Sequence, residues 1–198
     1  MNKVDAASVT TTASTLLAGL TNTRMNEIQL INGCKRNEGK SQKTLYDLYA
    51  RKMMAVCMRY VNRREVAEDI LQEGFIKVFT SIGTYNFSGS FEGWIRRIFV
   101  NTALEYLRKN DVLRETVGLE DPGIFTEADP SAIDRLSANE LIEIIAQLPT
   151  GFRTVFNMFA IEGYSHKEIA ETLGITESTS RSQFTRAKKL LQKKLSQL

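Results

Sequence analysis

The chain has 198 residues, of which 42% are hydrophobic and 25% are charged, close to the averages of globular proteins. These proportions exclude a collagen-like, a wholly disordered or a purely coiled-coil protein, and the length suits one ordinary domain or two small ones. No stretch reaches the roughly 18 to 20 uninterrupted apolar residues that a membrane-spanning helix needs, so we predict no membrane insertion.

The residue types that build metal sites and disulfide frameworks are scarce in this chain. It contains two cysteines, Cys34 and Cys57, and a single histidine, His166, which are too few for a Cys/His zinc site. We therefore expect both cysteines to be small buried hydrophobic residues and expect no cofactor and no metal. The Thr-, Ala- and Ser-rich residues 1–24 lack the apolar run of a secretory signal, which favours a reducing, cytoplasmic location.

Charge is distributed unevenly along the chain. The net charge of +3 combines two basic segments, residues 41–110 and 151–198, with an acidic stretch at 111–150 that holds nine Asp and Glu against two Lys and Arg. Two separated basic segments indicate two contacts with a polyanion, although ordinary solvated helix faces explain the charge alone equally well. The stretch from Asn110 to about Ser131 contains two of the three prolines and no apolar periodicity, which predicts a linker.

The remaining periodicity is helical throughout. No segment alternates apolar and polar residues for long enough to predict a strand, so we predict an all-α fold of two small helical domains joined by an acidic linker. The predicted parts are a disordered extension at 1–24, a first domain at 25–110, the linker at 111–137 and a helix-turn-helix domain at 138–198.

The helix-turn-helix prediction depends on a chain of local signals. Ser165 and Glu168 have the spacing of a capping box, Gly174 supplies the left-handed residue that ends a short helix, and Thr176 caps a longer one. The longer helix has one apolar stripe and basic residues near its start, as docking in the DNA major groove requires. A bare αα-hairpin is the alternative, and Ser180 stands where such motifs usually bury a branched aliphatic residue.

A predicted helix over residues 65–79 has two distinct faces. One face is apolar, and the opposite face gathers Asp69, Gln72 and Glu73 around the aliphatic Ile76. An acidic and amide surface with one apolar side chain suits a basic protein partner. A plain solvated face with one exposed isoleucine is common, and the residues alone favour that interpretation.

A second predicted helix, over residues 91–109, follows a turn-rich loop that carries Tyr85 and Phe87. One stripe of this helix is polar and aromatic and consists of Trp94, Arg97, Asn101, Glu105 and Arg108. Aromatic rings interleaved with Arg and Asn are suited to capturing unstacked bases by stacking, edge hydrogen bonds and phosphate contacts. A tryptophan packed on another helix explains the stripe equally well.

Several motifs, taken together and in this order, resemble bacterial sigma factors of the extracytoplasmic-function (ECF) type. They are DILQEG at 69–74, WIRR at 94–97, VNTA at 100–103 and the helix-turn-helix. The resemblance runs from about Ile28 to Leu195, and the segments at 52–60 and 91–97 are similar to the versions found in Bacteroidetes. Residues 1–24 resemble nothing in the family.

The resemblance implies a protein without catalytic activity that directs core RNA polymerase to promoters, using the β′ clamp helices and the β flap as its contacts on the polymerase. The clamp helices would bind the surface formed by Asp69, Gln72, Glu73 and Ile76. The melted minus-10 element would be held by Tyr85, Phe87, Trp94, Arg97, Asn101 and Arg108. The minus-35 element would be read by Thr179, Arg181, Ser182, Thr185, Arg186 and Lys188.

The resemblance also implies that the acidic linker threads toward the polymerase active site and the RNA exit channel. Anti-sigma factors, often membrane-anchored, are common partners in the family. Two other classes compete with this interpretation. A stand-alone helix-turn-helix regulator would need a pocket-forming effector domain in place of the short, helical, basic N-terminal segment. An enzyme acting on DNA lacks support, because the chain has no clustered carboxylates for metals and no supported nucleophile.

Overall fold

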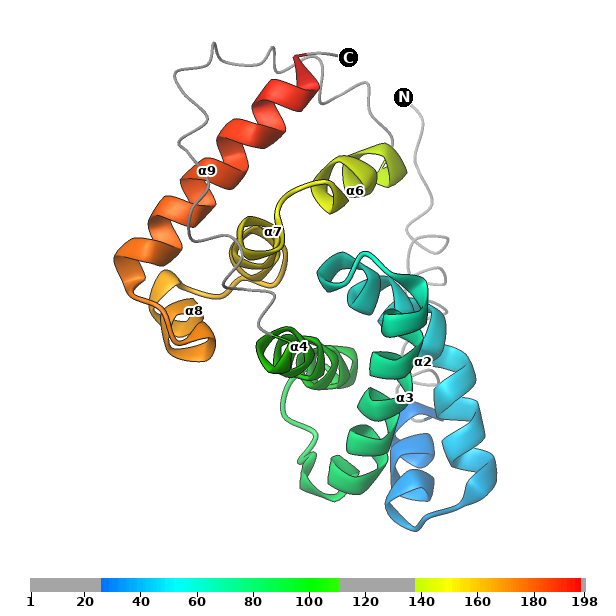
Figure 1. Ribbon diagram of the computed structural model, residues 1–198. Helices are drawn as coiled ribbons and strands as arrows, with labels where there is room; N and C mark the ends of the chain where they lie inside the picture. The colour runs from blue at the N-terminus through cyan, green and yellow to red at the C-terminus, as the bar shows by residue number, and fades with distance from the viewer. Residues whose placement is uncertain (1–25, 111–137, 197–198) are drawn as a thin grey trace, which may run out of the picture.

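The computed structural model describes residues 26–110 and 138–196, and this part of the chain contains helices and turns but no strand (Figure 1). A first helix runs through residues 26–35. The other elements are α2 (Gly39–Tyr60), α3 (Arg64–Ser81), the 3-10 turn η1 (Ile82–Thr84), α4 (Phe91–Lys109), α6 (Ala138–Ala146), α7 (Thr150–Phe156), the π-helical turn η3 (Asn157–Ile161), α8 (His166–Leu173) and α9 (Glu177–Leu195). The predicted all-α class is confirmed, while the predicted extension and linker lie outside the described residues.

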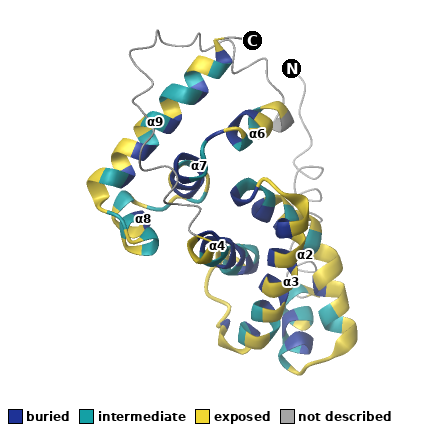
Figure 2. Cartoon of the chain, viewed as in Figure 1, coloured by how far each residue is buried: buried dark blue, intermediate teal, exposed yellow. Residues whose placement is uncertain are grey.

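Residues 26–110 form an N-terminal lobe around one apolar core. α2, α3 and α4 pack against one another, and their buried faces meet in the middle of the lobe (Figure 2). α3 turns its predicted apolar arc inward, with Ala67 and Val78 fully buried. Ser90 caps the start of α4, because its hydroxyl accepts a hydrogen bond from the backbone N–H of Gly93 at 3.2 Å. The predicted helix over 91–109 is therefore confirmed at both ends.

The two cysteines belong to this core. Cys34 and Cys57 are fully buried and unpaired. Burial raises the pKa of the Cys34 thiol to about 11 and that of Cys57 to about 12, so both remain neutral at physiological pH. The expectation that they are hydrophobic core residues is confirmed.

Residues 138–196 form a C-terminal lobe with the predicted helix-turn-helix. Both hydrogen bonds of the capping box are present between Ser165 and Glu168, and Gly174 has the left-handed φ of 68° that ends α8. The Thr176 hydroxyl accepts a bond from the Thr179 N–H at 3.0 Å and so caps α9. A second apolar core joins α6 and α7 to α9 and consists of Ile144, Ile145, Leu148, Phe152, Ala187, Leu191 and Leu195.

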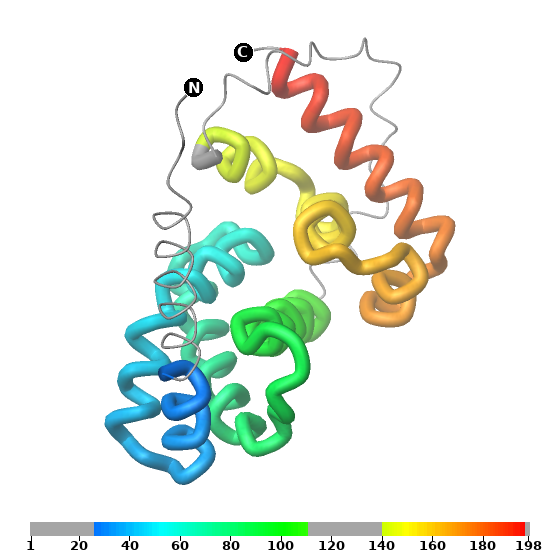
Figure 3. Tube along the Cα trace, turned by 180° about the vertical axis from the view of Figure 1, so that it is seen from behind, coloured from blue at the N-terminus to red at the C-terminus, as the bar shows by residue number. Residues whose placement is uncertain are grey.

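The two lobes lie against each other. α6 and α7 sit beside the C-terminal end of α2, as the views from the front and from behind both show (Figure 3). The core of the N-terminal lobe continues into the C-terminal lobe through Val155, Met158 and Ile169. The α4 helix thus lies close to the start of the helix-turn-helix.

Candidate nucleic-acid interface

The outer arc of α3, defined as Asp69, Gln72, Glu73 and Ile76, is exposed along its length. Ile76 is 64% exposed, the highest value for a large hydrophobic residue in the described part of the chain. Glu73 pairs with Lys77 at 2.9 Å, and Lys77 also binds Glu105 of α4 at 2.7 Å. The structure therefore brings the four predicted residues together on one acidic surface with an apolar centre.

The two aromatic residues of the loop before α4 differ in burial, although their ring centroids lie only 5.4 Å apart. Tyr85 is 4% exposed, packs against Phe91 and Trp94 with ring centroids 5.0 and 5.5 Å away, and donates its hydroxyl to the Gly89 carbonyl at 3.0 Å. Its ring is therefore part of the core and is not presented to a base in this structure. Sequence reasoning did not distinguish it from Phe87, because burial depends on how the loop folds back.

Phe87 is the exposed aromatic residue of this loop. Its ring is 40% exposed, and its backbone has a φ of 63°, a left-handed conformation that is uncommon for a bulky side chain. Lys35 holds the loop in place, because its ammonium donates to the Tyr85 carbonyl at 2.6 Å and lies 4.7 Å from the Phe87 ring centroid. Strained residues of this kind cluster at binding sites. The sequence carries no local signal for Lys35, which is about fifty positions away.

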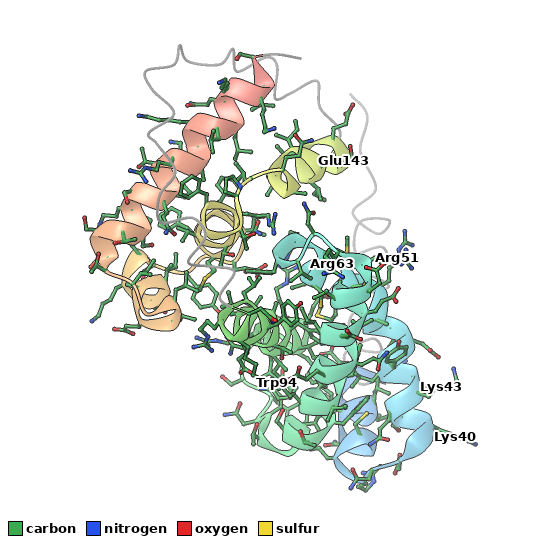
Figure 4. All side chains as sticks on the ribbon, viewed as in Figure 1. Lys40, Lys43, Arg51, Arg63, Trp94 and Glu143 are labelled. Carbon is green, nitrogen blue, oxygen red and sulfur yellow. The ribbon has the colours of Figure 1, made fainter. Side chains whose placement is uncertain are left out.

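The outer face of α4, defined as Trp94, Arg97, Asn101 and Arg108, begins next to this loop. Trp94 is half-buried, stacks on Phe91 at 5.7 Å and projects from α4 beside the loop (Figure 4). Its ring partners belong to its own helix and to the loop, and the side chain also packs against the apolar core of the N-terminal lobe.

The rest of that face runs from the loop toward the C-terminal lobe. Asn101 is exposed. Arg97 lies 6.0 Å from the ring centroid of Tyr164, and Arg108 donates to the Thr172 carbonyl at 3.4 Å. Both arginines of the face thus contact the other lobe.

The start of α9 carries the second predicted surface. Arg181, Ser182, Thr185 and Lys188 are exposed, and Thr179 and Arg186 are half-buried. Arg181 forms an ion pair with Glu177 one turn earlier, so any contact of its guanidinium with DNA competes with that pair. All six residues of the predicted minus-35 surface thus lie on α9.

Ser180 of α9 is fully buried and bonds His166 Nδ1 at 2.9 Å. The imidazole stacks on Phe159 with ring centroids 4.3 Å apart. Burial and the neighbouring Arg181 lower the pKa of His166, which favours the neutral ring. A polar pair thus fills the space where an aliphatic residue was expected, and it satisfies the buried hydroxyl.

The contact between the lobes involves residues that sequence reasoning missed. Arg153 is 5% exposed and donates to the carbonyls of Ala146 at 2.9 Å, Leu148 at 3.2 Å and Tyr60 at 3.0 Å. Its charge therefore lies at the C-terminal ends of helices from both lobes, where it is favourable. Burial lowers the pKa of Arg153. The sequence does carry a signal for this buried arginine, because Arg153 is the only charged residue between positions 151 and 161.

Asn157 and Glu162 complete this contact. The Asn157 amide donates to the Arg59 carbonyl at 2.8 Å, and Glu162 accepts from Arg59 at 2.7 Å. The second oxygen of Glu162 lies 3.5 Å from Arg96 of α4. The side chains of Glu162 and Arg59 are 4% and 14% exposed, whereas that of Arg96 is 36% exposed, so the cluster is buried at Glu162 and reaches water at Arg96.

Two classes of site have no support within 26–110 and 138–196. No helix there is both long and apolar enough to cross a bilayer. The same residues contain no group of three or more His, Cys, Asp or Glu side chains that could hold a metal ion.

Comparison with known proteins matches both lobes. The family model for Sigma-70 region 2 covers residues 45–112, and that for Sigma-70, region 4 covers residues 138–191. The chain is 28% identical to the ECF RNA polymerase sigma-E factor of Haemophilus influenzae, over 88% of this chain and 98% of the relative. It is 29% identical to the RNA polymerase sigma-H factor of Pseudomonas aeruginosa, over 89% of this chain and 97% of the relative.

Among solved structures, the chain is similar to the sigma factor RpoE in complex with the anti-sigma factor NepR from Bartonella quintana. The TM-score is 0.48 at 18% identity, and the match covers 79% of this chain and 96% of that one.

The two family models match different parts of the chain, in the order that the sequence resemblance predicts. A stand-alone helix-turn-helix regulator is not favoured, because the N-terminal lobe matches a region of sigma factors and the relatives align along nearly their whole length. The chain belongs to the sigma-70 family and is an ECF-type sigma factor that directs RNA polymerase to promoters.

Proposed function

We propose that the outer arc of α3 binds the clamp helices of the polymerase β′ subunit. The support is its composition: two carboxylates and an amide surround Ile76, whose side chain is 64% exposed. Charged residues on the rim of an interface steer association, while an apolar residue at its centre gains from burial. The C-terminal lobe contacts the β flap in this proposal, and the linker at 111–137 threads toward the active site and the RNA exit channel.

The N-terminal domain, residues 25–110, melts and holds the minus-10 element in this proposal. The observation that carries it is the exposed ring of Phe87, held in a strained loop beside Trp94 and followed along α4 by Asn101. Rings stack on unpaired bases of any sequence, and an amide hydrogen-bonds to base edges. Arg97 and Arg108 supply contacts to phosphates once they leave the other lobe. Tyr85 does not contact a base in this proposal; its ring supports the loop.

The helix-turn-helix domain, residues 138–198, reads the minus-35 element. Arg181 near the start of α9 has the reach and geometry for a bidentate contact to a guanine edge. Ser182 and Thr185 lie beside it, and Thr179, Arg186 and Lys188 are in position for further base or phosphate contacts.

Further properties follow from the family resemblance. The protein acts in the cytoplasm, has no catalytic activity of its own, and is held inactive by an anti-sigma factor that is membrane-anchored in many family members. The segments at 52–60 and 91–97 support an origin in Bacteroidetes, which placement in a tree of ECF sequences tests.

Reconstituted transcription tests the proposal. The purified chain is added to core polymerase with a library of promoter fragments, and transcripts are mapped. We expect transcripts that start at fixed positions and require the chain, and we expect their number to fall when Phe87 is replaced by Ala. Substitution of Tyr46, another exposed aromatic residue that lies on α2, is the control and leaves transcription unchanged. Transcripts that are independent of the chain, or unaffected by Phe87→Ala, contradict the proposed roles.

A further inference from the structure

A cavity of about 710 Å³ lies in the N-terminal lobe between the first helix, residues 26–35, and α2. Leu30 lines it from the first helix, and Leu48 and Tyr49 line it from α2. Leu48 is 57% exposed, although it follows the fully buried Leu45 by one turn on the same helix. Apolar surface in contact with water at the edge of a core is stabilised when another apolar surface covers it. The cavity therefore offers apolar surface to an occupant.

The charges around this cavity are balanced. Among the described residues that line it, the charged ones are two acids, Glu27 and Glu38, and two bases, Arg36 and Lys52, so their charges sum to zero. Arg36 pairs with Glu38 at 2.8 Å, and Lys52 pairs with Glu92 of α4 at 2.6 Å. Specific recognition of an ion needs a surplus of opposite charge. The cavity therefore favours an uncharged, apolar occupant over an ionic one.

The sequence just before the cavity has this character. Residues 6–23 are the longest stretch of the chain without Asp, Glu, Lys, Arg or His, and they include the apolar run LLAGL at 16–20. The stretch ends two residues before Asn26, which itself lines the cavity. Leu20 is six positions from Asn26, and six residues span up to about 20 Å when extended, enough to reach the cavity. So short a tether gives a roughly millimolar effective concentration, at which even a weak contact forms.

Both walls of the cavity also touch the segment that carries Phe87. Lys35, at the end of the first helix, donates to the Tyr85 carbonyl at 2.6 Å and lies 4.7 Å from the Phe87 ring centroid. On the other wall, Tyr49 of α2 packs against Phe91, the first residue of α4, with ring centroids 5.8 Å apart. An occupant that joins the two walls therefore steadies the loop between them.

We propose that residues 6–23 dock in this cavity, with Leu16, Leu17 and Leu20 covering Leu48, and that the docked segment braces the loop before α4. A Thr-, Ala- and Ser-rich segment buries too little apolar surface to fold alone, but it gains order on a folded surface that completes its apolar contacts. The cavity supplies such a surface on the same chain. Neither the docking nor the brace rests on the proposed promoter function.

Thiol reactivity tests the docking in the full-length chain. Thr44 lines the cavity and is exposed, so Thr44→Cys places a reporter thiol there, whereas both native cysteines are buried. Replacing Leu16, Leu17 and Leu20 together by Ser removes the apolar contacts of the segment. We expect the reporter to react with Ellman's reagent several-fold faster in this leucine variant, with unchanged helicity by circular dichroism.

Two controls and two contrary outcomes belong to this test. Serine at Thr10, Thr11 and Thr12 changes as many residues of the same segment but keeps the leucines, so the rate should not change. A reporter at Lys43, which points away from the lobe, should react equally fast with and without the leucines (Figure 4). Equal rates of the Thr44 reporter in both chains mean an open cavity and overturn the docking. A rate that falls with rising protein concentration means that a second copy fills the cavity, which overturns it too.

The cavity side gives an independent test. Leu48→Ser removes apolar surface from the cavity, and trypsin should then cleave after Arg24 several-fold faster, because a protease needs an extended, undocked segment around the cleaved bond. Mass spectrometry follows the loss of residues 1–24. Ile142→Ser is the matched control, since Ile142 is an aliphatic residue of α6 with 46% exposure, and it should leave the cleavage rate unchanged. Equal cleavage of the Leu48 variant and the unaltered chain overturns the docking.

The brace has its own readout. Amide hydrogen exchange of residues 85–90 should be several-fold faster in the leucine variant than in the unaltered chain, because local opening is easier where fewer contacts hold a segment. A faster Thr44 thiol with unchanged exchange in the loop overturns the brace but leaves the docking. Failure of the proposed promoter function appears separately, as loss of chain-dependent transcripts in the reconstituted system.

Discussion

Gly74 marks the closest approach of α3 to α4. A Cβ atom at this position would lie 2.3 Å from Cε1 and 2.6 Å from Cδ1 of Phe99. Carbon atoms that are not bonded pack at about 3.5 to 4.0 Å, so the ring would have to move. Phe99 is fully buried and makes an edge contact with Phe75 at 5.1 Å, which leaves it little room.

Replacing Gly74 by Ala should therefore destabilise the chain. Alanine favours a helix over glycine by about 1 kcal/mol, but overpacking a filled core costs about 1 to 3 kcal/mol, so we expect a net loss of about 1 kcal/mol in unfolding free energy. Urea denaturation measures it. Gly93→Ala is the matched control, because the nearest atom to its Cβ is 3.6 Å away, and it should be neutral or stabilising. Equal stability of the two variants would contradict the packing argument.

His166 gives the chain a predictable response to pH. Its pKa is lowered by burial and by the positive charge of Arg181, with Glu177 opposing the shift, so the folded chain binds fewer protons than the unfolded chain just below the usual histidine pKa of about 6.5. Stability then falls as the pH is lowered from about 7.5 to about 5.5. No other histidine contributes, because the chain has only one.

The measurement is the unfolding free energy across that pH range for the unaltered chain and for His166→Asn. Asparagine offers a bond to Ser180 but does not titrate, so the dependence on pH should become flatter in the variant. A slope that survives the substitution would assign the effect to other groups.

At the scale of single elements, α3 presents two independent surfaces. Its inner arc builds the core, and its outer arc is held by Lys77, which binds Glu73 on the same helix and Glu105 on α4. A substitution on the outer arc therefore leaves the inner arc and the second ion pair of Lys77 in place.

Glu73→Lys should weaken binding to core polymerase while leaving helicity unchanged. Reversing one charge at a contact changes the Coulomb energy by a few kcal/mol at a dielectric constant of about 20, so affinity should fall by roughly ten-fold or more. Co-purification and titration with core polymerase measure the change. Asp47→Lys on α2 breaks an equivalent exposed pair with Lys43, and this control should bind normally. Equal binding by both variants would show that the outer arc is merely solvated.

α4 and α9 should act at different steps of initiation. Arg181→Ala removes a proposed contact to a guanine edge worth about 1 to 3 kcal/mol, so it should relax preference at the minus-35 element and weaken closed complexes. Asn101→Ala should leave closed complexes near normal and reduce strand opening, with poor rescue by a premelted minus-10 template. Footprinting of closed and open complexes distinguishes the two. If both variants lose the same step, the division of labour is wrong.

At the scale of the whole molecule, each basic surface is small, and that of α4 is engaged with the other lobe. The free chain should therefore bind promoter duplex weakly, and the holoenzyme should bind it tightly. Mobility shifts at physiological salt measure both, since salt weakens phosphate contacts strongly. Tight sequence-specific binding by the free chain, comparable with that of the holoenzyme, would favour a stand-alone regulator.

Local chemistry was readable from the sequence because each signal acts within a few residues. The capping box at Ser165, the left-handed Gly174 and the limits of α4 depend on hydrogen bonds to near neighbours, and the helical periodicity separates buried from exposed faces. The order of motifs along the chain, compared with known families, was enough to indicate the function. The outer arc of α3 was exposed as predicted for the same reason.

Only the tertiary structure decided which residues far apart in the chain meet. Tyr85 and Phe87 look equivalent in sequence, but the fold of the loop buries one ring and leaves the other exposed. Ser180 stands where such motifs usually bury an aliphatic residue, and only the structure shows that His166 lies beside it and bonds its hydroxyl. The pairing of Arg59 with Glu162 spans about a hundred residues, and no local pattern encodes it. Contacts of this kind are set by how the lobes dock, which depends on the shape and charge of whole surfaces.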